Sequence, residues 1–215
     1  NVLSSRTAQH VGDIFGDKRS AITSAAYLYG ELLVSPGKET EYLSSFECDS
    51  GFDLVRFVDK NGRSTTSDGS NTDVSDRDYF IKGMQGESGC THVDESRFTG
   101  SRLVGFFAPV RSGGEICGVL AGFLEEETVS AVLETDLYGY PAFTMLITAD
   151  GESLGQYRTP ELDTMQDLSS TIDRINTDSA AELRSALAER STLSFSFVGT
   201  RGRSAGELRP VDGTE

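Results

Sequence analysis

A chain of 215 residues is long enough to bury one substantial core or two modest ones. Nineteen basic side chains stand against 34 acidic ones, which gives a formal net charge of −15. A surface of that sign repels phosphate groups, so the composition argues against nucleic acid and anionic membrane surfaces as partners.

No apolar run approaches the roughly 20 residues that a bilayer-spanning helix needs, and no segment has the pattern of a signal peptide. The chain starts at Asn1 without a methionine and ends at Glu215 directly after Arg209-Pro210-Val211. We interpret it as an excised piece of a longer protein.

The first predicted element is a long helix within residues 1–35. Its apolar residues recur at spacings of three and four, which is typical of one helical stripe. They are Val11, Ile14, Phe15, Ile22, Ala25, Ala26, Tyr29, Leu32 and Leu33. A helix that begins near Asn1 and ends at Ser35-Pro36-Gly37 would extend about 50 Å at 1.5 Å per residue.

Residues 36–133 are predicted to form a first module of mixed helix and strand. A short helix around residues 42–46 precedes an apolar strand over residues 52–58 and a polar strand over residues 63–66. Asn61-Gly62 between the two strands is a hairpin signal.

The second half of this module begins with Ser75 and Asp78, whose spacing resembles a capping box that opens a helix through about residue 84. Residues 86–99 are polar and are predicted to be irregular. Strands over residues 102–110 and 115–124 follow, and a helix over residues 126–133 leaves the module.

Residues 134–215 repeat this order in a weaker form. An apolar strand over residues 142–149 is followed by a turn and a polar strand over residues 152–157. Ser179 and Glu182 are predicted to cap a helix, and strands over residues 193–198 and 204–209 come last. The shared order predicts a second, related module, which is expected to be truncated at its last strand.

The cysteines and histidines show no metal-binding spacing. Cys117 lies in an apolar run and is expected to be a small buried side chain. Cys48 and Cys90 could pair in an oxidising compartment, and the sequence does not decide between a disulfide and free thiols. His10 and His92 share no motif, so neither a metal site nor a cofactor is predicted.

Known catalytic signatures are absent from the sequence. There is no Gly-x-Ser-x-Gly elbow, phosphate-binding Walker loop or His-Glu-x-x-His helix. Catalysis would have to rest on carboxylates alone, and a solvated acidic surface explains those equally well. The chain itself is therefore predicted not to be an enzyme.

The segment from Ser75 to Phe80 is the strongest candidate for a binding site. It places Arg77 beside Tyr79 and Phe80 at the start of a predicted helix. A guanidinium can hold a carboxylate through two parallel hydrogen bonds, and aromatic rings supply flat walls. A structural interpretation fits the same spacing, with Arg77 paired to Asp76 or Asp78 and both rings in the core.

Several short stretches follow one another in a specific order. They are Phe57-Val58-Asp59-Lys60-Asn61-Gly62, Ser67-Asp68-Gly69, Asp76-Arg77-Asp78-Tyr79-Phe80, Gly100, Ala108-Pro109-Val110, Gly113-Gly114 and Ile116-Cys117-Gly118-Val119-Leu120. In this order they resemble the membrane-distal module of a double Cache sensor, also called PDC-like. The long helix and the second module fit the same architecture, so the resemblance covers the whole chain.

That resemblance implies an α+β fold, in which a long N-terminal helix is followed by two tandem PAS-like modules, each with a central antiparallel sheet. It also implies a ligand in the distal module, between the sheet and a cap of helix and loop. The amino-acid-binding branch carries Arg-x-Trp-Tyr at the position of residues 77–80. Arg77 is thus expected to hold a ligand carboxylate, with Tyr79 and Phe80 beside it.

Two departures from that branch concern the ligand amine. A Tyr and an Asp of the branch have no clear equivalent near residues 94–97, and Phe123 stands where the branch has the Asp that binds the amine. A buried ammonium needs an anionic or carbonyl partner. The ligand is therefore predicted to be a small molecule and not a standard α-amino acid. A carboxylate without an amine, a small polar metabolite and a ligand held mainly by aromatic rings all fit.

Further polar contacts are expected from Asp68 and Ser96. A purine or amine ligand held by Asp68 or Asp94 stays open as an alternative.

These features predict an extracytoplasmic small-molecule sensing domain of a bacterial membrane signalling receptor, located on the outer face of the cell membrane. The output could be a diguanylate cyclase, a histidine kinase or a chemotaxis module, and a homodimer through the N-terminal helix is expected. Two alternatives remain. One is a structural or partner-protein interaction module without a ligand, and the other, less favoured, is a secreted hydrolase that uses acidic residues.

Overall fold

The computed structural model describes residues 2–32, 38–93, 96–97, 100–134, 143–159, 177–199 and 202–212. The chain divides into two compact units. The larger unit is built from residues 14–128, and the smaller unit from residues 129–212 with the first 13 residues. Helix α1 (Val2–Leu32) therefore contributes residues to both units. No helix in the described ranges has both the length and the apolar character that a bilayer crossing requires.

The larger unit contains a six-stranded antiparallel sheet with the order β3-β2-β1-β6-β5-β4. Its strands are β1 (Leu54–Asp59), β2 (Arg63–Thr66), β3 (Asn71–Asp73), β4 (Gly89–Val93), β5 (Leu103–Ser112) and β6 (Glu115–Glu125). Gly113 and Gly114 turn β5 into β6 with φ values of 60° and 88°. A tight hairpin of this kind requires a left-handed backbone, which glycine adopts without a steric penalty.

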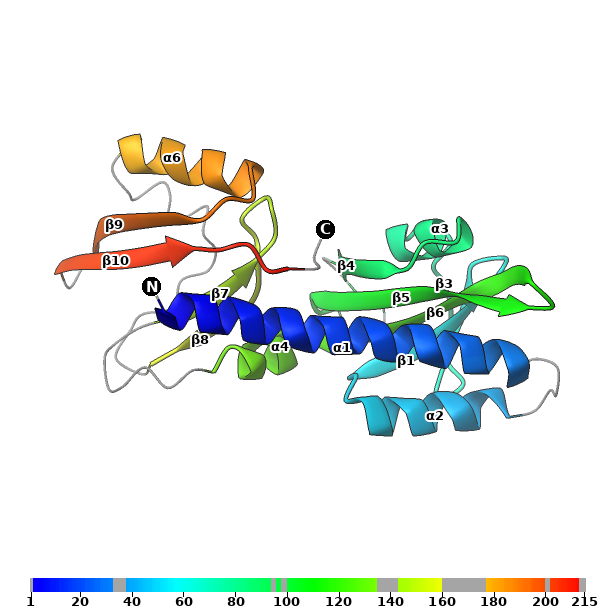
Figure 1. The fold of residues 1–215 in the computed structure, drawn as a ribbon. Helices are drawn as coiled ribbons and strands as arrows, with labels where there is room; N and C mark the ends of the chain where they lie inside the picture. The colour runs from blue at the N-terminus through cyan, green and yellow to red at the C-terminus, as the bar shows by residue number, and fades with distance from the viewer. Residues whose placement is uncertain are drawn as a thin grey trace. The chain divides into compact units, whose positions relative to one another are not determined.

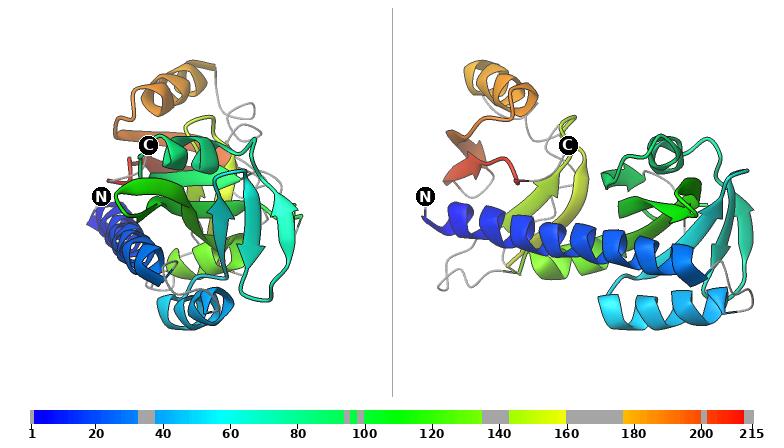
Figure 2. Two further views of the ribbon diagram at one scale, coloured as in Figure 1. Left: turned by 90° about the vertical axis from the view of Figure 1, so that its right-hand side faces the viewer. Right: turned by 45° about the vertical axis from the view of Figure 1, so that its right-hand side comes forward.

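Helices cover both faces of this sheet (Figures 1 and 2). On one face, α1 packs with α2 (Glu39–Ser50), and the ring of Phe15 meets Phe106 of β5 edge-on with 5.2 Å between centroids. On the other face lies α3 (Asp78–Met84), whose buried Tyr79 and Phe80 join a core with Val119 and Phe123. Side chains alternate between the two faces along each strand. We call the face that packs against α3 the α3 face.

The smaller unit consists of two antiparallel hairpins and a helix. One hairpin pairs β7 (Phe143–Ile147) with β8 (Ser153–Arg158), and the other pairs β9 (Leu193–Gly199) with β10 (Gly202–Leu208). Helix α6 (Thr177–Ala188) buries Leu183 fully, with Ile147, Leu193 and Phe195 packed nearby. Helix α4 (Glu126–Val132) leads the chain into this unit.

The structure confirms the α+β fold class, with its long N-terminal helix and antiparallel sheets. The capping box at Ser75 was wrong, because α3 begins at Asp78 with Arg77 as its N-cap residue. The backbone amide of Ser75 instead donates to Asp73 Oδ1 at 2.9 Å, so this segment forms an Asx turn.

Residues 86–99 were predicted to be irregular, yet they contain β4, which pairs with β5 from Gly89 to Val93. An edge strand pairs with its neighbour through backbone donors and acceptors. Its sequence therefore need not alternate between apolar and polar residues. Helix α6 begins two residues before its predicted cap, Ser179. None of Cys48, Cys90 and Cys117 forms a disulfide in the structure.

Candidate ligand-binding pocket

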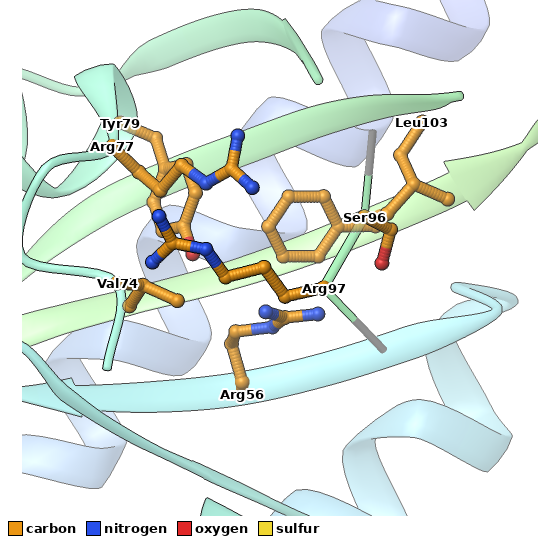
Figure 3. Close-up of a pocket in the computed structure, with 8 residues that line it drawn as sticks. Arg56, Val74, Arg77, Tyr79, Ser96, Arg97 and Leu103 are labelled. Atoms are coloured by element: carbon orange, nitrogen blue, oxygen red, sulfur yellow. The ribbon is translucent and has the colours of Figure 1, made fainter. Parts of the chain in front are cut away.

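A pocket lies between the α3 face of the sheet and the segments that cover it. The empty space in and above it is about 230 Å³, which includes open solvent. The described residues that line it are Arg56, Val74, Arg77, Tyr79, Ser96, Arg97, Leu103 and Phe123. They come from three strands of the sheet, from the β3–α3 region and from the segment between β4 and β5 (Figure 3).

Phe123 of β6 forms part of the floor of this pocket. It stands opposite Gly105 of β5 in the strand register, and a Cβ atom on Gly105 would lie only 2.8 Å from Cε1 of Phe123. Because Gly105 has no side chain, the Phe123 ring can occupy the space beside it. Tyr79 meets this ring edge-on, with 5.3 Å between centroids, so α3 is packed against the floor through an aromatic pair.

Arg56 of β1 is the second floor residue, and sequence reasoning missed it. Its side chain is 3% exposed, and its guanidinium carbon lies 4.6 Å from the centroid of the Phe123 ring. Burial lowers the pKa of Arg56, while the nearby Tyr79 hydroxyl opposes that change. An arginine guanidinium nevertheless stays protonated in proteins, so the floor carries a buried positive charge.

Tyr79 contributes both a wall and a polar atom. Its hydroxyl is buried and lies beside the guanidinium of Arg56. Burial raises the pKa of this hydroxyl, although the charges of Arg56, Arg77 and Arg97 oppose the rise. The group thus remains a neutral donor that a ligand oxygen can use.

Arg97 is a second residue that the sequence did not single out. Its Nη2 atom donates to Asp76 Oδ2 at 2.7 Å, and its Nη1 atom donates to the backbone carbonyl of Asp73. The hydrogen bond between Arg97 and Asp76 lowers the pKa of the Asp76 carboxyl and raises the pKa of Arg97. Arg97 therefore ties the segment before β5 to the segment before α3 beside the pocket.

Four of the six predicted site residues line this pocket, namely Arg77, Tyr79, Ser96 and Phe123. Arg77 has an extended backbone with φ −82° and ψ 136° as the N-cap of α3, and its side chain reaches into the pocket together with those of Arg56 and Arg97 (Figure 3). Their roles in binding remain predictions.

Phe80 and Asp68 are not among the described lining residues. Phe80 is 8% exposed in the core of the α3 face. Asp68 lies in the turn between β2 and β3, where its carboxylate accepts hydrogen bonds from Thr66 Oγ1 at 2.5 Å and from the Ser70 amide at 2.8 Å. These bonds lower the pKa of Asp68 to about 2. Asp94, named with the amine alternative, lies outside the described residues.

Neither a family model nor a curated protein matches the sequence, but solved structures match nearly the whole chain. The ligand-binding domain of the Pseudomonas aeruginosa PAO1 amino acid chemoreceptor PctB, in complex with L-Gln, is 19% identical with a TM-score of 0.71. The match covers 99% of this chain and 84% of that chain.

Two further structures give similar values. The extracellular domain of rpHK1S-Z16, assigned as a histidine kinase, is 21% identical with a TM-score of 0.72, over 99% of this chain and 88% of that chain. The ligand-binding domain of the Pseudomonas fluorescens chemoreceptor CtaA, in complex with L-alanine, is 18% identical with a TM-score of 0.70, over 98% and 88%. The chain thus shares the fold of these sensor domains, which confirms the fold predicted from the double Cache resemblance.

Proposed function

We propose that this chain is the extracytoplasmic sensing domain of a bacterial membrane signalling receptor and that it binds a small carboxylate. The observation that carries the proposal is the convergence of Arg56, Arg77 and Arg97 on one pocket. The pocket also lies between a sheet and a cover of helix and loop, which is where the resemblance leads us to expect a ligand. The structural neighbours, which are ligand-binding or extracellular domains, support the same function.

The ligand of this pocket is a carboxylate without an amine. PctB and CtaA were solved with amino acids, and the ammonium group of such a ligand needs an acceptor when it leaves water. The described lining residues include no aspartate or glutamate, and Phe123 provides only a ring. The described lining therefore offers strong donors for a carboxylate and no anion for an ammonium.

In the proposed receptor, residues 36–133 form the membrane-distal module that binds the ligand, and residues 134–215 form the membrane-proximal module. The helix within residues 1–35 pairs two copies of the chain as a homodimer. Signalling requires only that the ligand bind one arrangement of the domain better than another. The sensing domain performs no catalysis, and the output is a separate cyclase, kinase or chemotaxis module.

A comparison of matched ligands tests this proposal. The melting temperature of the 215-residue chain is measured with a panel of short carboxylates and with the corresponding α-amino acids, such as propionate against L-alanine. A ligand at about 100 times its Kd stabilises a protein by about 2.7 kcal/mol, which raises the melting temperature by about 5–10 °C for a chain of this size. We expect that rise with a carboxylate and not with its amino analogue.

Two variants locate the binding. Arg77→Met removes the guanidinium and should abolish the rise, whereas Arg63→Met, at an exposed position of β2 outside the described lining, should retain it. An equal rise with the amino acid would remove the argument about the amine. A full response of Arg77→Met would move the ligand to another site.

A further inference from the structure

The charge of the pocket lining defines the ligand more narrowly. We infer, on the basis of the proposed function, that the ligand is a small dianion, such as a dicarboxylate. Arg56 and Arg97 each recognise one of its two ends, and Arg77 assists them. The described lining contains these three cations and no acidic side chain. In a chain with a net charge of −15, the described lining residues therefore carry the opposite sign.

The first anionic group binds at the floor. Arg56 lies on the α3 face of β1, opposite Ala121 of β6, and its side chain is 3% exposed. An anion at this depth interacts with the guanidinium through a low dielectric, where an ionic hydrogen bond is strongest. The buried hydroxyl of Tyr79 supplies one further donor at the same place.

The second anionic group binds near the opening. The side chain of Arg97 is 38% exposed, and that of its counterion Asp76 is 61% exposed. An ion pair so open to water is worth little, so a ligand carboxylate can share the guanidinium or displace Asp76 from it. Because a guanidinium has five N–H donors, the hydrogen bond to the Asp73 carbonyl can persist.

Arg56 and Arg97 thus differ in exposure within one pocket, and a ligand with two anionic groups can engage each guanidinium with a separate group. A dicarboxylate carries one anionic group at each end. Inorganic phosphate has the same charge in a smaller volume, and the experiment separates it from a dicarboxylate.

Calorimetric titration of the 215-residue chain tests the inference with isosteric pairs. Malonate, succinate and glutarate are each compared with their monoamides, which keep the length and shape of the diacid and lack one charge. A hydrogen bond to a charged group contributes roughly 1.5–3 kcal/mol, so the best diacid should bind about tenfold to a hundredfold tighter than its monoamide. Phosphate is titrated separately.

Arg56→Met and Arg97→Met should each weaken diacid binding by a similar factor, with Arg63→Met as the matched control. Arg97→Met should also reduce the preference for the diacid over its monoamide, because that preference needs the second cation. Ligand-free melting of each variant checks folding. If Arg56→Met does not fold, Arg97→Met carries the test, since its side chain is partly exposed.

The outcomes separate this inference from the proposed function. Equal affinity for a diacid and its monoamide, with binding still dependent on Arg77, would overturn the dianion and leave a carboxylate sensor. Binding of phosphate in preference to every diacid would overturn the recognition of two separate ends and the choice of a carboxylate as ligand. Failure of all these anions to bind would overturn both proposals.

Discussion

The fit of Phe123 over Gly105 makes the pocket floor sensitive to a single methyl group. In a Gly105→Ala variant, the new Cβ would lie 2.8 Å from Cε1 and 3.0 Å from Cδ1 of Phe123, and 3.1 Å from Cγ2 of Thr91. The ring cannot move freely, because it is 1% exposed and packed against Tyr79. Overpacking of this kind costs about 1–3 kcal/mol, and the displaced ring should also weaken ligand binding.

Gly89→Ala is the matched control on the neighbouring strand β4. Its Cβ would lie 3.6 Å from the ring of Phe107, which is ordinary contact. Both variants gain about 0.4–1 kcal/mol from a stiffer unfolded chain, so their difference isolates the clash. We therefore expect Gly105→Ala to be less stable than Gly89→Ala by about 1–3 kcal/mol.

Urea unfolding followed by far-ultraviolet circular dichroism measures this difference, since the chain contains no tryptophan for a fluorescence assay. The Phe123→Leu background adds a double-mutant cycle, in which removal of the ring should reduce the cost of Gly105→Ala. Equal stability of the two alanine variants would refute the packing argument. So would a cost that does not change in the Phe123→Leu background.

Two further predictions concern α1 and the turn between β2 and β3. A Cβ on Gly30 would lie 2.1 Å from the carbonyl oxygen of Arg111, whereas a Cβ on Gly16 of the same helix meets nothing within 4 Å. In thermal unfolding, Gly30→Ala should therefore lose at least about 2 kcal/mol of stability, and Gly16→Ala should gain up to about 1 kcal/mol. The pKa of Asp68 is about 2 against its ordinary 3.8, so the stability it adds should be complete above pH 3.8 and be lost as the pH falls toward 2. Urea midpoints of the parent and of Asp68→Asn should accordingly converge with falling pH, and a constant gap would contradict the hydrogen bonds to Asp68.

The sequence predicted those elements whose pattern is local. The apolar stripe of α1, the turn between β1 and β2 and the glycine turn between β5 and β6 all leave a local signal, and each is present in the structure. Strand β4 was missed because its pairing with β5 depends on backbone groups of a distant segment. The start of α3 was misplaced because Asp73, and not Ser75, supplies the polar side chain of the turn.

The lining of the pocket was also predicted only in part, because only some of its residues leave a local signal in the sequence. Arg77, Tyr79, Ser96 and Phe123 line one pocket, and these positions came from the family resemblance together with local chemistry. Phe80 shares the core of the α3 face with Tyr79 but is not among the described lining residues. A lone cation inside the apolar run from Phe52 to Val58 was a readable signal for Arg56. Arg97 gave no such signal, because only the fold brings it to Asp76.

The buried cation on β1 separates a sensing role from a purely structural one. Its neighbours on the α3 face, Leu54 and Val58, are apolar, and methionine at position 56 would fill similar space without desolvating a charge. The ring of Phe123, 4.6 Å from the guanidinium carbon, stabilises the cation from one side.

A binding role predicts that the response to ligand depends on this guanidinium, because an anion at this depth interacts with it through a low dielectric. Arg56→Met should therefore gain little from a ligand that stabilises the parent. A lower ligand-free melting temperature with an undiminished response to ligand would make Arg56 a structural residue and detach it from the pocket's function.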